Sequence, residues 1–315
     1  MNLNEMKFYC TIFSIAIIIL GLSACDKESN VTDQSQMLTI NAEIVESTNA
    51  AKSSFEKDDE LGLFLKDSGN QNYNDCDCNF NLKSTYSGVD WQLNEVVLLS
   101  EEHATLYAYY PYNATLMDCT ALPIQASTQT DYLYAIPIQV DAANPKATLS
   151  MQHALSLAKF SIHRGSYAGP GKISSITLQH ITKNGTLNTH SGSISAGQIG
   201  DEIYIPSQEL LLSNSSDPLA IGIITIPMAI TSSSAIFCID GVDYLLKLAN
   251  SVWEAGKETT YTLSIDSDSK TLLSIENVSI NPWGTGGSYE GTLMGGGFEV
   301  EVEGAKDVDV SQISN

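Results

Sequence analysis

The side chain best placed for a chemical reaction is a cysteine at the end of an apolar run near the N-terminus. Lys7 precedes this uncharged run, which has the layout of a secretory signal and is short for a membrane-spanning helix. The run ends in Leu22-Ser23-Ala24-Cys25, which matches the bacterial lipobox, where the cysteine thiol is acylated and the chain is cut just before it. We predict a lipoprotein signal peptide over 1–24 and an acylated tether over 25–37. Because each buried CH₂ contributes about 0.8 kcal/mol, an acylated Cys25 would hold the protein firmly to a membrane.

The remaining reactive side chains form no arrangement that is typical of an active site. The histidines are scattered, and "HSGSIS" (190–195) lacks the Gly-x-Ser-x-Gly spacing of a nucleophile elbow. The stretches "DCDCN" (75–79) and "DSDSK" (266–270) alternate oxygen ligands, but both lack the glycine and glutamate of a calcium loop and are interpreted as acidic turns. The sequence predicts a protein that is not an enzyme, with no catalytic residue, metal site or cofactor.

The cysteines leave the disulfide state open. Cys10 is lost with the predicted signal peptide, which leaves Cys76, Cys78, Cys119 and Cys238 besides the lipid site. An exported compartment permits disulfides, but this spacing defines no disulfide framework. A bridge from Cys76 or Cys78 to Cys119 and the absence of any bridge are both compatible with the sequence.

The charge balance excludes one class of partner. The chain has 15 Lys and Arg residues against 37 Asp and Glu residues, a net charge of −22. Such a surface repels phosphate backbones, so we expect no nucleic-acid binding. The tyrosine-rich stretch "LYAYYPYN" (106–113) is therefore not a platform for stacking bases.

The elements that must position these residues are short strands. Leu38, Ile40, Ala42 and Ile44 alternate with polar residues, which is the period of a strand with one buried face. Further strands are predicted from runs of apolar and β-branched residues bounded by Gly, Asn, Ser, Asp and Pro. They cover 61–66, 96–100, 104–110, 132–140, 158–163, 173–179, 202–205, 219–226, 235–239, 244–248 and 261–265.

Many short strands, and no convincing amphipathic helix, predict an all-β protein built from sandwiches. We predict an N-terminal β-sandwich over 38–165 and a C-terminal β-sandwich over 166–284, followed by a glycine-rich acidic tail over 285–315. Within the tail, Phe298, Val300 and Val302 alternate with glutamates and predict a further strand with one apolar face.

The tyrosines of "LYAYYPYN" fit the same architecture. In an extended chain Tyr107 and Tyr109 point to one face, while Tyr110 points to the other and Pro111 ends the ladder. Aromatic rings suit a half-buried pleated surface, so we interpret them as packing groups of a sandwich. A platform for stacking sugars is the alternative.

Several stretches together resemble the fimbrillin family, the pilin subunits of type V pili. "LYAYYPYN" follows "WQL" (91–93) at a short interval, and the order and spacing of the other stretches extend the resemblance over about 40–283. They are "SSFEKDDELGLFL", "YLYA", "LSMQHALSLAKFSI", "YAGPGKISSITL", "WEAGKETTYTLSI" and "VSINPW".

The resemblance implies two tandem transthyretin-like β-sandwich domains, delivery to the outer membrane as a lipoprotein, and assembly into a surface filament. In the family a protease removes the N-terminal segment with the first strand, and a strand of a neighbouring subunit fills the groove. Here the strand with Leu38, Ile40, Ala42 and Ile44 would be the exchanged segment. Such strand addition pairs free backbone groups and covers an apolar slot.

The chain departs from the family at the processing site. Family members matured by an arginine-specific protease have an arginine after the first strand, whereas "VESTNAAKSSFEKDD" has only Lys52 and Lys57. Either another protease acts, with Lys52 as the candidate site, or the subunit is never processed and serves as a terminal or basal component. The tail with Phe298, Val300 and Val302 is either a donor strand for another subunit, an edge strand of its own domain, or a disordered acidic end.

These observations predict a surface-exposed fimbrial subunit or pilus-associated adhesin, assembled by strand exchange. Its expected partners are other pilin subunits, outer-membrane lipid through acylated Cys25, and a host or bacterial surface ligand. The alternative is a surface glycan-binding lipoprotein that does not polymerise, in which exposed tyrosines and Trp91 stack on sugars.

Overall fold

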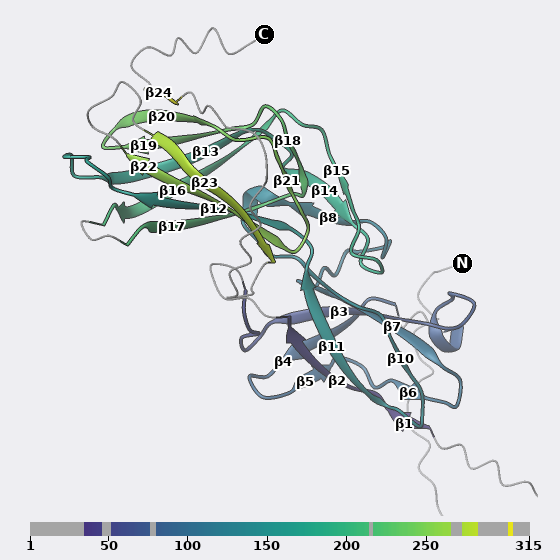
Figure 1. The fold of residues 1–315 in the computed structure, drawn as a ribbon. Helices are drawn as coiled ribbons and strands as arrows, with labels where there is room; N and C mark the ends of the chain where they lie inside the picture. The colour runs from purple at the N-terminus through teal and green to yellow at the C-terminus, as the bar shows by residue number, and fades with distance from the viewer. Residues whose placement is uncertain are drawn as a thin grey trace, which may run out of the picture. The chain divides into compact units, whose positions relative to one another are not determined.

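Strands make up almost all of the regular structure in the computed structural model (Figure 1). The structure describes residues 35–45, 52–75, 80–213, 217–265, 273–282 and 302–304. Among these, the only helical turns are the short 3₁₀ segments η1 (Tyr73–Asp75) and η3 (Ala126–Thr128). The all-β class predicted from the sequence is confirmed. Cys25, Cys76, Cys78, Phe298 and Val300 lie outside the described residues.

The first large sheet contains the N-terminal strand at one edge. Its order is β2-β11-β9-β7-β3-β4-β5, and β10 pairs with β7 off this path. The short strands β1 (Gln36–Met37) and β6 (Leu98–Leu99) pair beside it. The bounds are β2 Thr39–Ile44, β3 Glu60–Lys66, β4 Leu82–Tyr86, β5 Trp91–Leu93, β7 Ala104–Tyr110, β9 Leu133–Ala135, β10 Ile138–Val140 and β11 Lys146–His153.

Two further sheets pack face to face. One has the order β17-β12-β22-β23 and the other β16-β13-β19-β20-β24. Phe160 of β12 contacts Phe237 of β19 edge to face, with ring centroids 5.2 Å apart, so the two sheets share one core. The bounds are β12 Ser156–His163, β13 Lys172–Ile181, β16 Asp201–Leu211, β17 Leu219–Thr225, β19 Ser234–Ile239, β20 Val242–Lys247, β22 Lys257–Ile265, β23 Leu273–Pro282 and β24 Val302–Gly304.

Two small sheets complete the described structure. One has the order β15-β14-β8, and the other pairs β18 with β21. Their bounds are β8 Leu122–Gln125, β14 Asn184–Leu187, β15 Ile194–Ala196, β18 Met228–Ile230 and β21 Ser251–Trp253.

Strands from the two halves of the sequence pair with one another. β12 lies before residue 165, yet it pairs with β17 and β22, and β8 pairs with β14. The described residues from 35 onward form one compact unit. The division into sandwich domains over 38–165 and 166–284 stays a prediction.

The tyrosine strand β7 faces two cores. Leu106 and Ala108 belong to the core of the first sheet, whereas Tyr109 is fully buried in the core that contains β12 and β13. Tyr107 packs on the same side as Tyr109, and Tyr110 packs on the side of Leu106. The predicted alternation of these rings is therefore confirmed, and they act as packing groups between layers.

Candidate functional site

The N-terminal strand β2 is an edge strand with one buried face. It pairs in parallel with β11, in a register that places Thr39 opposite Lys146 and Ile44 opposite Met151. Leu38 and Ile40 are 2% and 8% exposed, whereas the intervening Thr39 is exposed. The alternation predicted for this strand is present. Burial of two such side chains contributes roughly 3–6 kcal/mol, since each contributes about 1.5–3 kcal/mol.

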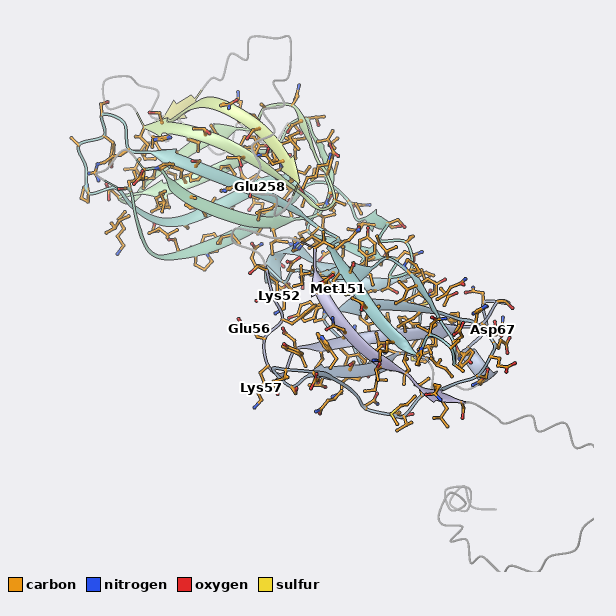
Figure 2. All side chains as sticks on the ribbon, turned by 60° about the horizontal axis from the view of Figure 1, so that its bottom comes forward. Lys52, Glu56, Lys57, Asp67, Met151 and Glu258 are labelled. Atoms are coloured by element: carbon orange, nitrogen blue, oxygen red, sulfur yellow. The ribbon has the colours of Figure 1, made fainter. Side chains whose placement is uncertain are left out.

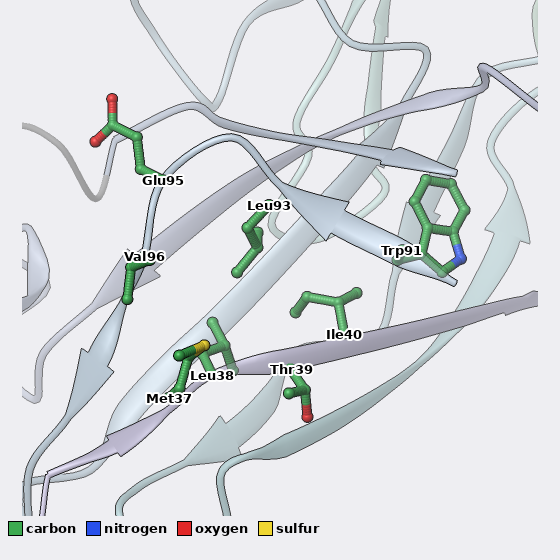
Figure 3. Close-up of a pocket in the computed structure, with 8 residues that line it drawn as sticks. All are labelled: Met37, Leu38, Thr39, Ile40, Trp91, Leu93, Glu95 and Val96. Atoms are coloured by element: carbon green, nitrogen blue, oxygen red, sulfur yellow. The ribbon is translucent and has the colours of Figure 1, made fainter. Parts of the chain in front are cut away.

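The opposite edge of the same sheet, β5, faces β2 across a gap. Figure 3 shows Trp91 and Leu93 of β5, Leu38 just before β2 and Ile40 within it, all beside this gap. The resulting cavity has a volume of about 190 Å³ and is lined by Met37, Leu38, Thr39, Ile40, Trp91, Leu93, Glu95 and Val96.

Few backbone bonds tie β2 to anything except β11. The Leu38 N–H donates to the Val97 carbonyl at 2.9 Å, beyond the end of β5. The backbone edges of β2 and β5 form no ladder, although they lie on either side of the cavity. β2 is thus held by one ladder and by apolar burial beside the cavity, and the preceding β1 adds a two-residue pairing with β6.

Lys52, the candidate processing residue, is bound into the fold. Its Nζ lies 2.7 Å from Asp59 Oδ2, and its side chain is 16% exposed. The ammonium also lies 5.0 Å from the ring centroid of Tyr110 and 5.8 Å from that of Phe55, within the range of cation–π attraction. Burial alone would lower the pKa of Lys52, but the hydrogen bonds and charges of Asp59 and Tyr110 together outweigh it and raise the pKa.

Asp59 is held from a second side by the tyrosine strand. The Tyr110 hydroxyl donates to Asp59 Oδ1 at 3.0 Å. Burial and the nearby Asp59 charge raise the pKa of Tyr110, so the hydroxyl keeps its proton and remains a donor. Lys52, Asp59 and Tyr110 therefore form one bonded cluster at the end of β7.

The backbone of Lys52 is fixed by a buried acid. Its N–H donates to Asp131 Oδ2 at 3.3 Å, and the same oxygen lies 2.9 Å from His153 Nδ1 at the end of β11. Asp131 and His153 are 7% and 5% exposed. Lys57, in contrast, is exposed on the turn that leads into β3 (Figure 2).

The sequence did not point to Asp131, Asp59 or His153. The burial of His153 could have been predicted, because every second residue of β11 is buried and His153 follows Ala147, Leu149 and Met151 in this alternation. Asp59 and Asp131 lie in loops without a periodic pattern, and they meet Lys52 only through the fold.

Trp91 is mostly buried and offers little ring surface for stacking on a sugar. It is 8% exposed and contacts Phe55 edge to face, with ring centroids 4.9 Å apart. Tyr109 is fully buried, and its hydroxyl donates to Asn81 Oδ1 at 2.7 Å. The structure therefore gives no support to the sugar-binding alternative at these rings.

The tail strand is placed only in part. β24 begins at Val302 and pairs antiparallel with β20, with Val302 opposite Leu246. Within its own chain this segment extends the edge of a sheet, which is one of the alternatives predicted for the tail. Its use as a donor strand remains a prediction.

The single arginine, Arg164, is also engaged. Its guanidinium donates to the carbonyl oxygens of Tyr167, Gly169, Pro170 and Leu212.

Over the described residues, no group of three or more His, Cys, Asp or Glu side chains could hold a metal ion. The two cysteines among these residues, Cys119 and Cys238, are free thiols. None of the described helical segments is long and apolar enough to cross a membrane.

A model of the fimbrillin-like protein family matches residues 48–283. No functionally curated protein matches the chain. Among solved structures, a Bacteroides uniformis protein assigned to cell adhesion superposes with a TM-score of 0.62 at 18% identity, covering 80% of this chain and 100% of its own. A protein of Bacteroides ovatus assigned to cell adhesion superposes with a TM-score of 0.64 at 19% identity, covering 79% of this chain and 98% of its own. A fimbrial protein of Bacteroides vulgatus superposes with a TM-score of 0.52 at 11% identity, covering 78% of this chain and 99% of its own. At these identities the likeness concerns the fold.

Proposed function

The chain belongs to the fimbrillin-like family, and from this premise we propose that it is a surface fimbrial subunit or pilus-associated adhesin that assembles by strand exchange. The observation that carries the proposal is the state of β2, an apolar edge strand beside a cavity, held by one backbone ladder. Its partners would be further pilin subunits, of the same or a related kind.

Exchange would be driven by the backbone groups and apolar surface that the removal of β2 exposes. Removing β2 exposes the backbone edge of β11 and the apolar surface under Leu38 and Ile40. Stability of a domain is about 5–15 kcal/mol in total, so losing roughly 3–6 kcal/mol of burial is a large fraction. A strand from a second subunit restores both the ladder and the burial, and a head-to-tail contact of this kind propagates as a filament.

Delivery and anchoring follow from the N-terminus. We propose that Cys25 is acylated, that the precursor is anchored in the outer membrane, and that the assembled protein meets a host or bacterial surface ligand. Proteolytic processing at Lys52 would separate the exchangeable strand from the rest of the chain. The side chain of Lys52 is bonded to Asp59 and its backbone N–H to Asp131.

A truncation tests strand exchange. The chain from residue 26 is compared with the same chain lacking 26–51, by size-exclusion chromatography and electron microscopy. We expect the truncated protein to form oligomers or short filaments and the longer one to stay monomeric. A synthetic peptide of residues 36–45 should suppress the oligomers by refilling the slot. A truncated protein that remains a monomer with unchanged melting would show that β2 is not exchangeable.

A further inference from the structure

The carboxylate of Asp131 is a buried acceptor with unused capacity. Oδ2 accepts the Lys52 N–H at 3.3 Å and lies 2.9 Å from His153 Nδ1. Oδ1 is buried and has no hydrogen-bond partner among the described residues. A buried acceptor without a donor is unfavourable, so a further hydrogen-bond donor beside this carboxylate would be stabilising.

The lysine beside this acid pairs with a different carboxylate. Asp59 and Asp131 lie on either side of Lys52, but its single ammonium goes to Asp59, which the Tyr110 hydroxyl also contacts. His153 is the other titratable group against Asp131. The cluster has two carboxylates for one lysine, and a second ammonium would complete it.

We propose that Asp131 is the receptor for the α-ammonium group of a mature chain that begins at Lys52. The inference rests on the proposed processing at Lys52 and specifies its chemistry. Hydrolysis breaks the peptide bond between Ala51 and Lys52. Water supplies an oxygen to the Ala51 carbonyl, which becomes a carboxylate, and its protons go to the Lys52 nitrogen, which becomes an ammonium.

Cleavage on the amino side of Lys52 agrees with how the side chain is held. A protease that cuts after lysine must take the extended side chain into its own pocket. Here that side chain is 16% exposed and bonded to Asp59. A cut before Lys52 leaves the side chain in place, and only the backbone nitrogen changes.

The new terminus would strengthen a contact that already exists. The amide N–H that donates to Asp131 Oδ2 becomes an ammonium with three donors, so the same nitrogen offers more donors to a carboxylate whose Oδ1 has none among the described residues. Hydrogen bonds between ionised partners are about twice as strong as neutral ones. The mature chain would therefore be fixed at its first residue while β2 is free to leave.

A nicked full-length protein tests the receptor without relying on the natural protease. In the chain from residue 26, residues 48–51 are replaced by the factor Xa sequence Ile-Glu-Gly-Arg, so that cleavage leaves Lys52 first and β2 still present. The matched control carries the same sequence at 47–50 and begins with Ala51 after cleavage. Each α-amine is acetylated at pH 7, and its rate is followed by mass spectrometry of the N-terminal peptide. Each rate is divided by the acetylation rate of the same α-amine in the urea-unfolded protein, which removes intrinsic differences in reactivity between the two amines.

We expect the Lys52 α-amine to react about tenfold more slowly than the Ala51 α-amine, because a rise of one pKa unit leaves about tenfold less free amine. Asp131→Asn should remove the difference. Equal normalised rates in the two nicked proteins would overturn the proposal, and this comparison stands even if Asp131→Asn fails to fold. Neither outcome depends on filament formation, so failure of the receptor and failure of strand exchange are separate results.

Discussion

Among single residues, Lys52 lies at the centre of a bonded cluster that strand exchange would have to leave intact. Asp59 receives the Lys52 ammonium at 2.7 Å and the Tyr110 hydroxyl at 3.0 Å, and it joins the segment before β3 to the end of β7. The sequence showed a lysine after a strand and a tyrosine-rich strand. It did not show that they share a carboxylate, because loop residues have no periodicity from which a contact can be predicted.

Removing this carboxylate should destabilise the folded protein. We expect Asp59→Asn to lower the free energy of unfolding at pH 7 by about 1.5–3 kcal/mol, the range for hydrogen bonds to charged groups. Asp58→Asn is the matched control, since Asp58 is exposed and asparagine also tolerates its positive φ of 72°. Urea unfolding measures both variants, and equal loss in the two would contradict a specific role of Asp59.

The same contact has a pH dependence of defined sign. The pKa of Lys52 is raised above its usual 10.5 in the folded protein, so the stability from this lysine is fully present below pH 10.5 and is lost as pH rises through the raised pKa. The difference between the parent and Asp59→Asn should therefore persist from pH 7 to about pH 10 and shrink at higher pH. A difference that grows above that pH would contradict the ion pair.

At the scale of elements, close packing between strands sets tight limits. Gly62 of β3 lies opposite Tyr109 of β7, and a Cβ at Gly62 would lie 2.0 Å from the Tyr109 ring. The ring cannot move easily, because its hydroxyl donates to Asn81 and Asn113. A glycine in a buried strand is therefore required here by the neighbouring aromatic ring.

We expect Gly62→Ala to lower the free energy of unfolding by about 1–3 kcal/mol, as overpacking does in other cores. Gly69→Ala is the control, because the nearest atom to its added Cβ is the side-chain oxygen of Asp67 at 3.3 Å in an exposed turn. Thermal melts of both variants decide the matter, and a neutral Gly62→Ala would mean that the Tyr109 ring can shift aside.

Strands whose apolar residues alternate clearly were mostly predicted from the sequence, whereas the pairing between strands was not. The tyrosine strand matches its predicted bounds of 104–110, and Leu38, Ile40, Ala42 and Ile44 face the core as expected. The predicted strand over 132–140 is instead β9 and β10, since Pro137 cannot donate to a ladder. β11 was missed although Ala147, Leu149 and Met151 alternate, and so the parallel partner of β2 was found only in the structure.

At the scale of the whole molecule, the family, the fold and the state of β2 point to a subunit that is stable alone and can join others. A net charge of −22 opposes non-specific association of such subunits. In the proposed strand exchange, assembly would begin with cleavage of the connection between β2 and β3. The single arginine is bonded to four carbonyl oxygens, so an arginine-specific protease would find no extended arginine at position 164.

The most direct test follows the release of β2 from a nicked chain. Asn41 and Thr148 are partners in the β2–β11 register, so Asn41→Cys with Thr148→Cys can staple the strand through a disulfide. The stapled chain is nicked between β2 and β3 and studied by native mass spectrometry, oxidised and then reduced. Asn41→Cys alone is the control. We predict that the oxidised protein stays monomeric, with the N-terminal peptide that contains β2 still attached. Reduction should release this peptide and yield oligomers. A reduced, nicked protein that stays monomeric and keeps one such peptide per chain would contradict strand exchange.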